Sequence, residues 1–112
     1  MISIDFLLEI PALVGIIFII TGILMQVFPP KKINPLYGYR TRSSMQNQQK
    51  WDFSQKYSAK LLTVIGLALV LIPSLNIFFT IPDDLEKIIS AILIIGSVIF
   101  LVIKTESKLK DI

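Results

Sequence analysis

Three long apolar runs, separated by short charged stretches, dominate the sequence. They cover residues 10–28, 61–81 and 88–103, and none contains Asp, Glu, Lys or Arg. A helix needs about 20 apolar residues to cross the hydrocarbon core of a bilayer. The first two runs have this length, and the long side chains of Lys87 and Lys104 can carry the third to both interfaces. We therefore expect an all-α, integral membrane three-helix bundle.

Charged residues alternate in sign between successive connections. The connection at 82–87 and the N-terminus carry mainly acidic residues, whereas the C-terminal tail and the loop at 29–60 are basic. Membrane proteins keep lysine and arginine in cytoplasmic connections. The sequence therefore predicts a multi-pass protein with its N-terminus outside and its C-terminus cytoplasmic. The loop that is predicted to be cytoplasmic contains Lys31, Lys32, Arg40, Arg42, Lys50, Lys56 and Lys60 against Asp52 alone.

Small residues recur at intervals of seven in each run. Seven residues are close to two helical turns, so each set lies on one helix face. Small residues on one face let membrane helices approach closely. The pattern predicts helices packed through these faces, although small residues are common enough in spans for the spacing to arise by chance. The sets are Gly15 and Gly22, then Ala59, Gly66 and Pro73, then Ser90 and Ser97.

The residue types that are missing exclude several kinds of chemistry. The chain contains no cysteine and no histidine, which rules out disulfides, thiolate metal sites and histidine-based nucleophilic catalysis within it. Ionisable residues inside a span usually mark ion paths and proton relays, and the three runs have none. The acidic candidates Asp52 and Asp83–Asp84 are predicted on opposite sides of the membrane. We expect no enzyme, no cofactor and no metal site.

The loop at 29–60 is the least hydrophobic part of the chain. Asn34-Pro35 and Gly38 are turn signals. Two interpretations compete: a basic segment that lies on anionic lipid, or a recognition element in which Arg40 makes planar, bidentate contacts. A nucleic-acid interface is disfavoured, because the segment is short and tied to the bilayer.

The second half of this loop has the pattern of a helix start. Ser43 followed by Gln46 fits a capping box, and nothing between Ser44 and Pro73 would break a helix. We therefore expect a helix from about Ser44 that leads into the second span. Aromatic rings here suit the headgroup level, so this is expected to be an amphipathic, interfacial loop helix anchored by Trp51.

The loop carries a block of residues that resembles a known family motif. The block reads Asn34-Pro35-Leu36-Tyr37-Gly38-Tyr39-Arg40-Thr41, followed by Ser43-Ser44-Met45-Gln46-Asn47, Lys50-Trp51 and Tyr57. It resembles the SdpI family, named for an immunity protein against a bacterial sporulation-delaying toxin. The family carries this block between the first two of three spans. The resemblance implies a single SdpI-like membrane domain over residues 1–112, equivalent to the terminal three-span part of a larger namesake.

The resemblance also implies which residues bind. Two positions depart from the family pattern: Gln46 stands where lysine is usual, and Gln55 where asparagine is often seen. The binding residues carried over from the motif are Asn34, Gly38, Arg40, Thr41, Ser44, Asn47 and Trp51.

The family resemblance suggests a function for the whole chain. It implies a small protein of the bacterial inner membrane that confers resistance to a membrane-active peptide toxin by non-covalent binding. The alternative is a structural or regulatory subunit that binds a larger membrane protein or a cytosolic regulator through the basic loop. The expected partners are the lipid bilayer and a peptide toxin or another membrane protein, with no nucleic acid. The sequence leaves open whether the protein forms a homo-oligomer.

Overall fold

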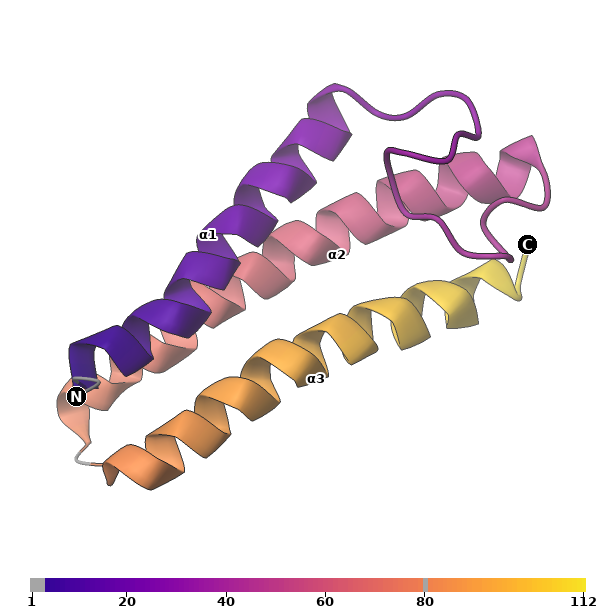
Figure 1. Ribbon diagram of the computed structural model, residues 1–112. Helices are drawn as coiled ribbons and strands as arrows, with labels where there is room; N and C mark the ends of the chain where they lie inside the picture. Colours follow the sequence, from indigo (N-terminus) through magenta and orange to yellow (C-terminus); the bar gives the residue numbers. More distant parts are fainter. Residues whose placement is uncertain (1–3, 80) are drawn as a thin grey trace.

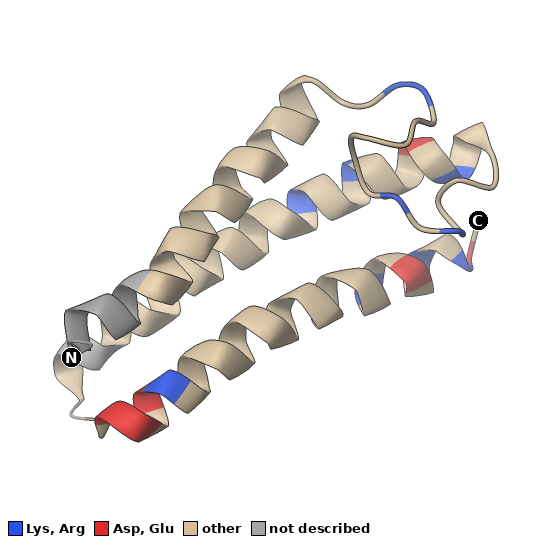
Figure 2. Cartoon of the chain, viewed as in Figure 1, with Lys and Arg blue, Asp and Glu red and all other residues tan. Residues whose placement is uncertain are grey.

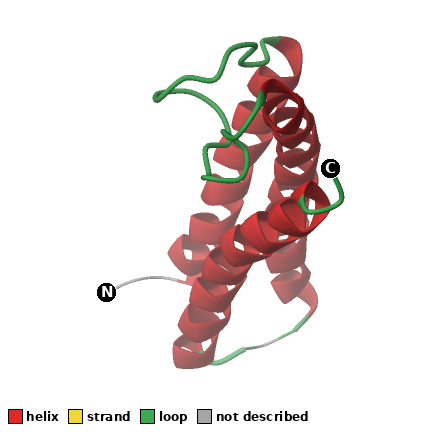
Figure 3. Cartoon of the chain, turned by 90° about the vertical axis from the view of Figure 1, so that its right-hand side faces the viewer, coloured by secondary structure: helices red, strands yellow, loops and turns green. Residues whose placement is uncertain are grey.

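Three long helices form an elongated molecule of 49 × 25 × 23 Å (Figure 1). The computed structural model describes residues 4–79 and 81–112, with the side chains of 10–75, 78–79 and 81–112. The helices are α1 (Ile4–Val27), α2 (Gln48–Ser74) and α3 (Asp83–Leu109), and a 3-10 turn, η1 (Leu75–Phe78), follows α2. The described residues contain no strand (Figure 3). The predicted all-α class is confirmed, with three helices long and apolar enough to cross a membrane.

The first two helices pack closely through glycine. A Cβ atom at Gly15 would lie 2.6 Å from the carbonyl oxygen of Gly66, and a Cβ atom at Gly66 would lie 2.6 Å from the carbonyl oxygen of Gly15. About two helical turns further along α1, a Cβ atom at Gly22 would lie 2.8 Å from the carbonyl oxygen of Ala59. The backbones touch at these positions, so the small-residue faces predicted for the first two spans do meet.

The third helix does not pack in the same way. A Cβ atom at Gly96 would meet nothing within 4 Å, and an open cavity of about 260 Å³ separates the middle of α2 from α3. Ser97 and Gly96 line this cavity, so the small residues of α3 do face α2. The helix nevertheless stands off along its middle (Figure 1). Close packing therefore holds for α1 with α2 and not for α3.

The start of α2 differs from the prediction. The helix begins at Gln48, and its N-cap is Asn47, whose side-chain oxygen accepts a hydrogen bond from the backbone nitrogen of Lys50 at 2.8 Å. The capping box expected at Ser43 is wrong. From Gln48 the helix continues unbroken into the apolar run. Residues 28–47 contain no helix, and no separate interfacial helix is seen.

The end of α2 also falls earlier than the apolar run suggests. Pro73 lies inside the last turn, and the helix stops one residue later at Ser74. Proline lacks the N–H that would bond the carbonyl oxygen of Leu69, so the last turn of α2 has one hydrogen bond fewer. The hydroxyl of Ser74 donates to the carbonyl oxygen of Leu71 at 2.5 Å. The second run, predicted as a span over 61–81, thus includes a 3-10 turn and a connection beyond the helix.

Charge separates the two ends of the molecule (Figure 2). The end that carries residues 28–47 is mainly basic. At the opposite end, the first turn of α3 carries Asp83, Asp84 and Glu86. The middle of the helices is apolar and largely exposed, as at Ile20 and Ile95. Exposed isoleucines suit contact with lipid chains, because the hydrocarbon core of a bilayer contains no water.

Candidate binding site: the loop between α1 and α2

The segment 28–47, here called the motif loop, begins with a turn built by Asn34. Its side-chain oxygen accepts hydrogen bonds from the backbone nitrogens of Leu36 and Tyr37, at 2.9 and 2.7 Å. Its amide nitrogen donates to the carbonyl oxygen of Lys32 at 2.9 Å. Asparagine commonly replaces backbone partners in this way at turns. Asn34 therefore shapes the first half of the loop, as the turn signal at this position predicts.

Arg40 lies on the surface of the loop. Its guanidinium donates a hydrogen bond to the carbonyl oxygen of Pro35, which ties the two halves of the turn together. The rest of its side chain is exposed. A guanidinium has five N–H donors, so this contact leaves donors for a further partner. The exposure of Arg40 and its remaining donors suit contact with a ligand.

The middle of the loop is held by one buried side chain of α2. Gln55 is 2% exposed, and its side-chain amide makes two hydrogen bonds to the backbone of Tyr39. Its Oε1 accepts from the backbone nitrogen of Tyr39, and its Nε2 donates to the carbonyl oxygen of Tyr39, each at 2.7 Å. Gly38 precedes this point with φ of 110°, a conformation that glycine adopts without strain. A Cβ atom there would lie 2.5 Å from the Gln55 side-chain oxygen. From the sequence, Gln55 stood out only as a departure from the family pattern, and its role in holding the loop was not predicted.

Trp51 is the centre of the packing between the loop and α2. Its side chain is 0% exposed, and its Nε1 donates to the carbonyl oxygen of Pro30 at 2.6 Å. The prediction that Trp51 anchors a helix at the bilayer surface is wrong, because the loop folds over the first turn of α2 and encloses the ring. An indole N–H needs a partner when it is buried, and Pro30 supplies one.

Thr41 and Ser44 close a second turn by reciprocal bonds. The backbone nitrogen of Thr41 donates to the hydroxyl of Ser44 at 2.8 Å, and the backbone nitrogen of Ser44 donates to the hydroxyl of Thr41 at 3.1 Å. Ser44 is fully buried. Hydroxyl groups that satisfy nearby backbone groups compete with helix formation. This turn explains why the helix starts at Gln48 and not near Ser44.

A carboxylate of α3 completes the loop. One oxygen of Glu106 accepts hydrogen bonds from the hydroxyls of Tyr39 and Thr41, at 2.7 and 2.9 Å. Burial, followed by the hydrogen bond to Glu106 and its charge, raises the pKa of Tyr39. The phenol is protonated at neutral pH in any case, and the raised pKa keeps it a hydrogen-bond donor into more alkaline solution. Glu106 was not among the residues picked from the sequence, because 67 positions separate it from Tyr39.

The seven residues carried over from the family motif come together in this one structure. All seven shape the loop or its junction with α2, as turn former, N-cap or buried core, and two of them, Arg40 and Asn47, are also exposed. Their part in ligand binding stays a prediction. Beside Arg40, the loop tip exposes Leu36, which is 87% accessible. Among the described residues, no group of three or more Asp and Glu could hold a metal ion.

Most of the motif loop and of the two helices that follow it lies within a stretch that matches a known protein family. The model of the SdpI/YfhL protein family matches residues 31–105, from the motif loop to the last turns of α3. An uncharacterized protein, YfhL of Bacillus subtilis (strain 168), is 39% identical over 99 residues, which cover 86% of this chain and 82% of the relative. No solved structure matches the chain. The loop, the apolar helices and the family match together show that the chain belongs to the SdpI/YfhL family.

Proposed function

We propose that this protein confers immunity to a membrane-active peptide toxin by binding the peptide without covalent chemistry. The observation that carries the proposal is family membership, which extends over the motif loop and two apolar helices. Protection against a peptide toxin is what resemblance to the family's namesake implies. Non-covalent binding needs neither a cofactor nor a metal, in keeping with a chain that has no cysteine and no histidine.

We propose the membrane of a bacterial cell as its location, with the motif loop in the cytoplasm. The basic loop end and the acidic start of α3 support this orientation (Figure 2). A chain without cysteine allows a direct test with Ser43→Cys and Asp84→Cys. In intact cells, an impermeant maleimide should label position 84, and position 43 only after permeabilisation. The reverse labelling would overturn the orientation.

The test of immunity is survival of a toxin-sensitive strain that expresses the protein. The strain is exposed to a panel of membrane-active peptides, and the killing concentration is compared with that of an empty-vector strain. A rise of tenfold or more for at least one peptide is expected. Unchanged killing by the whole panel, with the protein present in the membrane, would overturn the proposal.

Arg40→Ala then tests whether the motif loop takes part in protection. Arg42→Ala is the matched control, because it removes the same charge two positions away. The expected result for Arg40→Ala is normal insertion and reduced protection. If Arg40→Ala lowers the amount of inserted protein and protection falls only in proportion, the residue is architectural.

A regulatory or structural subunit is the second candidate function. The exposed Leu36 on the basic loop is compatible with it, because this side chain is accessible to a protein partner; contact with lipid is the competing explanation. A photo-reactive amino acid at position 36 would separate the two. Stoichiometric cross-linking to one membrane protein or cytosolic regulator supports a subunit, whereas cross-links to lipid alone exclude this surface as the contact.

A further inference from the structure

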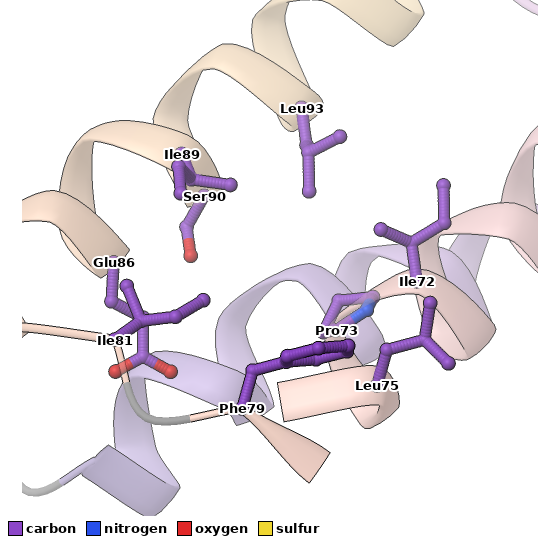
Figure 4. A pocket seen from close by; sticks show the side chains of 9 residues that line it. All are labelled: Ile72, Pro73, Leu75, Phe79, Ile81, Glu86, Ile89, Ser90 and Leu93. Carbon is purple, nitrogen blue, oxygen red and sulfur yellow. The ribbon is translucent and has the colours of Figure 1, made fainter. Parts of the chain in front are cut away.

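A pocket (Figure 4) lies between the end of α2 and the start of α3, at the end of the bundle opposite the motif loop (Figure 1). It has a volume of about 230 Å³ and is formed by the end of α2, the turn η1 with the connection that follows, and the start of α3. Most of its walls are apolar, with Ile72, Phe79 and Leu93 on different sides. Its polar lining residues are Glu86 and Ser90, which lie on neighbouring turns of α3.

Glu86 is an unusual residue in such a place. Acidic side chains near a helix N-terminus are stabilised by the helix dipole, and the exposed Asp83 and Asp84 already have this position. Glu86 is 4% exposed, although water is close at the end of the bundle. Its carboxylate lines the pocket, where burial limits the screening of its charge by water.

The lining points to one kind of ligand chemistry. A carboxylate shielded from water attracts a cation more strongly than an exposed one, and charge-assisted hydrogen bonds to an ammonium group are strong. The hydroxyl of Ser90 offers another acceptor, and the apolar walls can cover methylene groups. Asp83 and Asp84 in the same first turn of α3 disfavour an anion, and Lys87 is the basic residue nearby in sequence.

The volume limits the size of what can enter. An apolar cavity of about 150 Å³ holds one benzene ring. A pocket of about 230 Å³ therefore suits a single extended side chain with a terminal ammonium, and not a whole drug-sized molecule.

We propose that this pocket binds a primary ammonium group carried on an apolar chain, such as the side chain of a lysine in a membrane-inserted peptide. The ammonium pairs with Glu86 and Ser90, and the methylene groups lie against Ile72, Phe79 and Leu93. That the chain belongs to a peptide rests on the proposed function, whereas the ammonium chemistry rests on the pocket.

Octylammonium chloride is the probe, with octanol as its uncharged match. The full-length protein is placed in nanodiscs of zwitterionic lipid with 13C-labelled isoleucine and leucine methyl groups, and the methyl signals are followed during titration. Saturable shifts are expected at Ile72, Ile89 and Leu93, with an apparent Kd for octylammonium at least tenfold lower than for octanol. Equal shifts with both probes, or no saturation, would overturn the proposal.

Two variants and a control sharpen this test. Glu86→Gln should remove the preference for octylammonium, while Asp84→Asn, an exposed acid of the same turn, should leave Kd within twofold. If Glu86→Gln and Asp84→Asn weaken octylammonium binding equally, the charge of this surface explains the effect and the pocket does not. Ser90→Leu keeps the carboxylate but fills the pocket, so it should block both probes. Unimpaired binding by Ser90→Leu, with helicity unchanged by circular dichroism, would also overturn the site.

The survival assay separates this inference from the proposed function. If the wild-type chain protects cells from a lysine-containing peptide, Glu86→Gln should lose at least tenfold of that protection and Asp84→Asn should keep it. Protection retained in Glu86→Gln overturns the pocket as the peptide site and leaves immunity standing. Absence of protection in the wild type overturns immunity, and the octylammonium titration still decides the chemistry of the pocket.

Discussion

The two ends of this bundle are closed by different kinds of contact. At the motif loop, polar side chains hold one defined geometry: Gln55 grips a backbone unit, Glu106 accepts two hydroxyl groups, and Trp51 is enclosed with its N–H bonded. At the opposite end, mostly apolar side chains surround a pocket of about 230 Å³. Hydrogen bonds are directional, whereas apolar contacts are not. One end is therefore fixed in shape by directional contacts, and the other encloses an apolar pocket.

The sides of α2 differ in a related way. Toward α1, glycine brings two backbones into contact, as at Gly15 and Gly66. Toward α3, large side chains and a cavity of about 260 Å³ intervene. The loop end joins α3 to the rest through Glu106, and the connection after η1 joins it at the other end. The structure thus consists of a tightly paired α1–α2 unit with α3 held mainly at its ends.

The largest expected effect comes from Trp51→Ala, which removes the core of the loop end. Truncating a buried tryptophan typically costs about 3–5 kcal/mol. We expect loss of protection from hydrogen exchange across the motif loop and a lower thermal midpoint in detergent micelles. Phe53→Ala is the control, because Phe53 is only half-buried and stacks on Tyr57 with ring centroids 5.6 Å apart. Equal effects of the two variants would contradict the central position of Trp51.

Gly66→Ala tests the close contact of α1 with α2. The added methyl group would lie 2.6 Å from the carbonyl oxygen of Gly15, so the helices must separate, at a cost of about 1–3 kcal/mol. Gly96→Ala is the matched control on α3, where a Cβ atom meets nothing within 4 Å. Unfolding midpoints in detergent should fall for Gly66→Ala and stay level or rise for Gly96→Ala. A similar fall in both would mean that the two helix pairs pack alike.

Glu106→Ala should release the motif loop from α3. Hydrogen bonds to a charged group contribute about 1.5–3 kcal/mol, and partial exposure places this contact at the lower end. Faster amide exchange is expected around Tyr39 and Thr41, with the pocket at the other end unchanged. In a double-mutant cycle, Tyr39→Phe should add little once Glu106 is absent. Additive effects would show that the two residues act independently.

The smallest effect expected is a shift in the titration of Tyr39. Burial and Glu106 raise the pKa of its phenol above the ordinary value of 10.0. The stability that the protonated phenol contributes is thus present below pH 10 and is lost as pH rises through the raised pKa. The difference in ultraviolet absorbance between wild type and Tyr39→Phe isolates this titration. Ionisation at or below pH 10, or no downward movement in Glu106→Ala, would contradict the assigned contact.

Some of the motif loop could be predicted from local pattern. The turn at Asn34-Pro35 and the need for glycine at position 38 follow from residues that are close in sequence. The position of the N-cap could not be settled in this way. Ser43, Ser44 and Asn47 are all good caps, and the bonds between Thr41 and Ser44 decide the competition. The family match covers the block at 34–51 and confirms the family resemblance, while the binding role of these residues stays a prediction.

The sequence by itself determined the number of long apolar helices, the uneven distribution of charge and the family. The first two depend on composition over a window of residues, and a bilayer-length apolar run has few other folds. The family depends on a block of residue types at fixed spacing between two such runs. Only the tertiary structure showed that Trp51 is buried, that Gln55 and Glu106 hold the loop, and that Glu86 lines a pocket. These contacts join distant segments, and their geometry depends on how three helices pack, which no local pattern records.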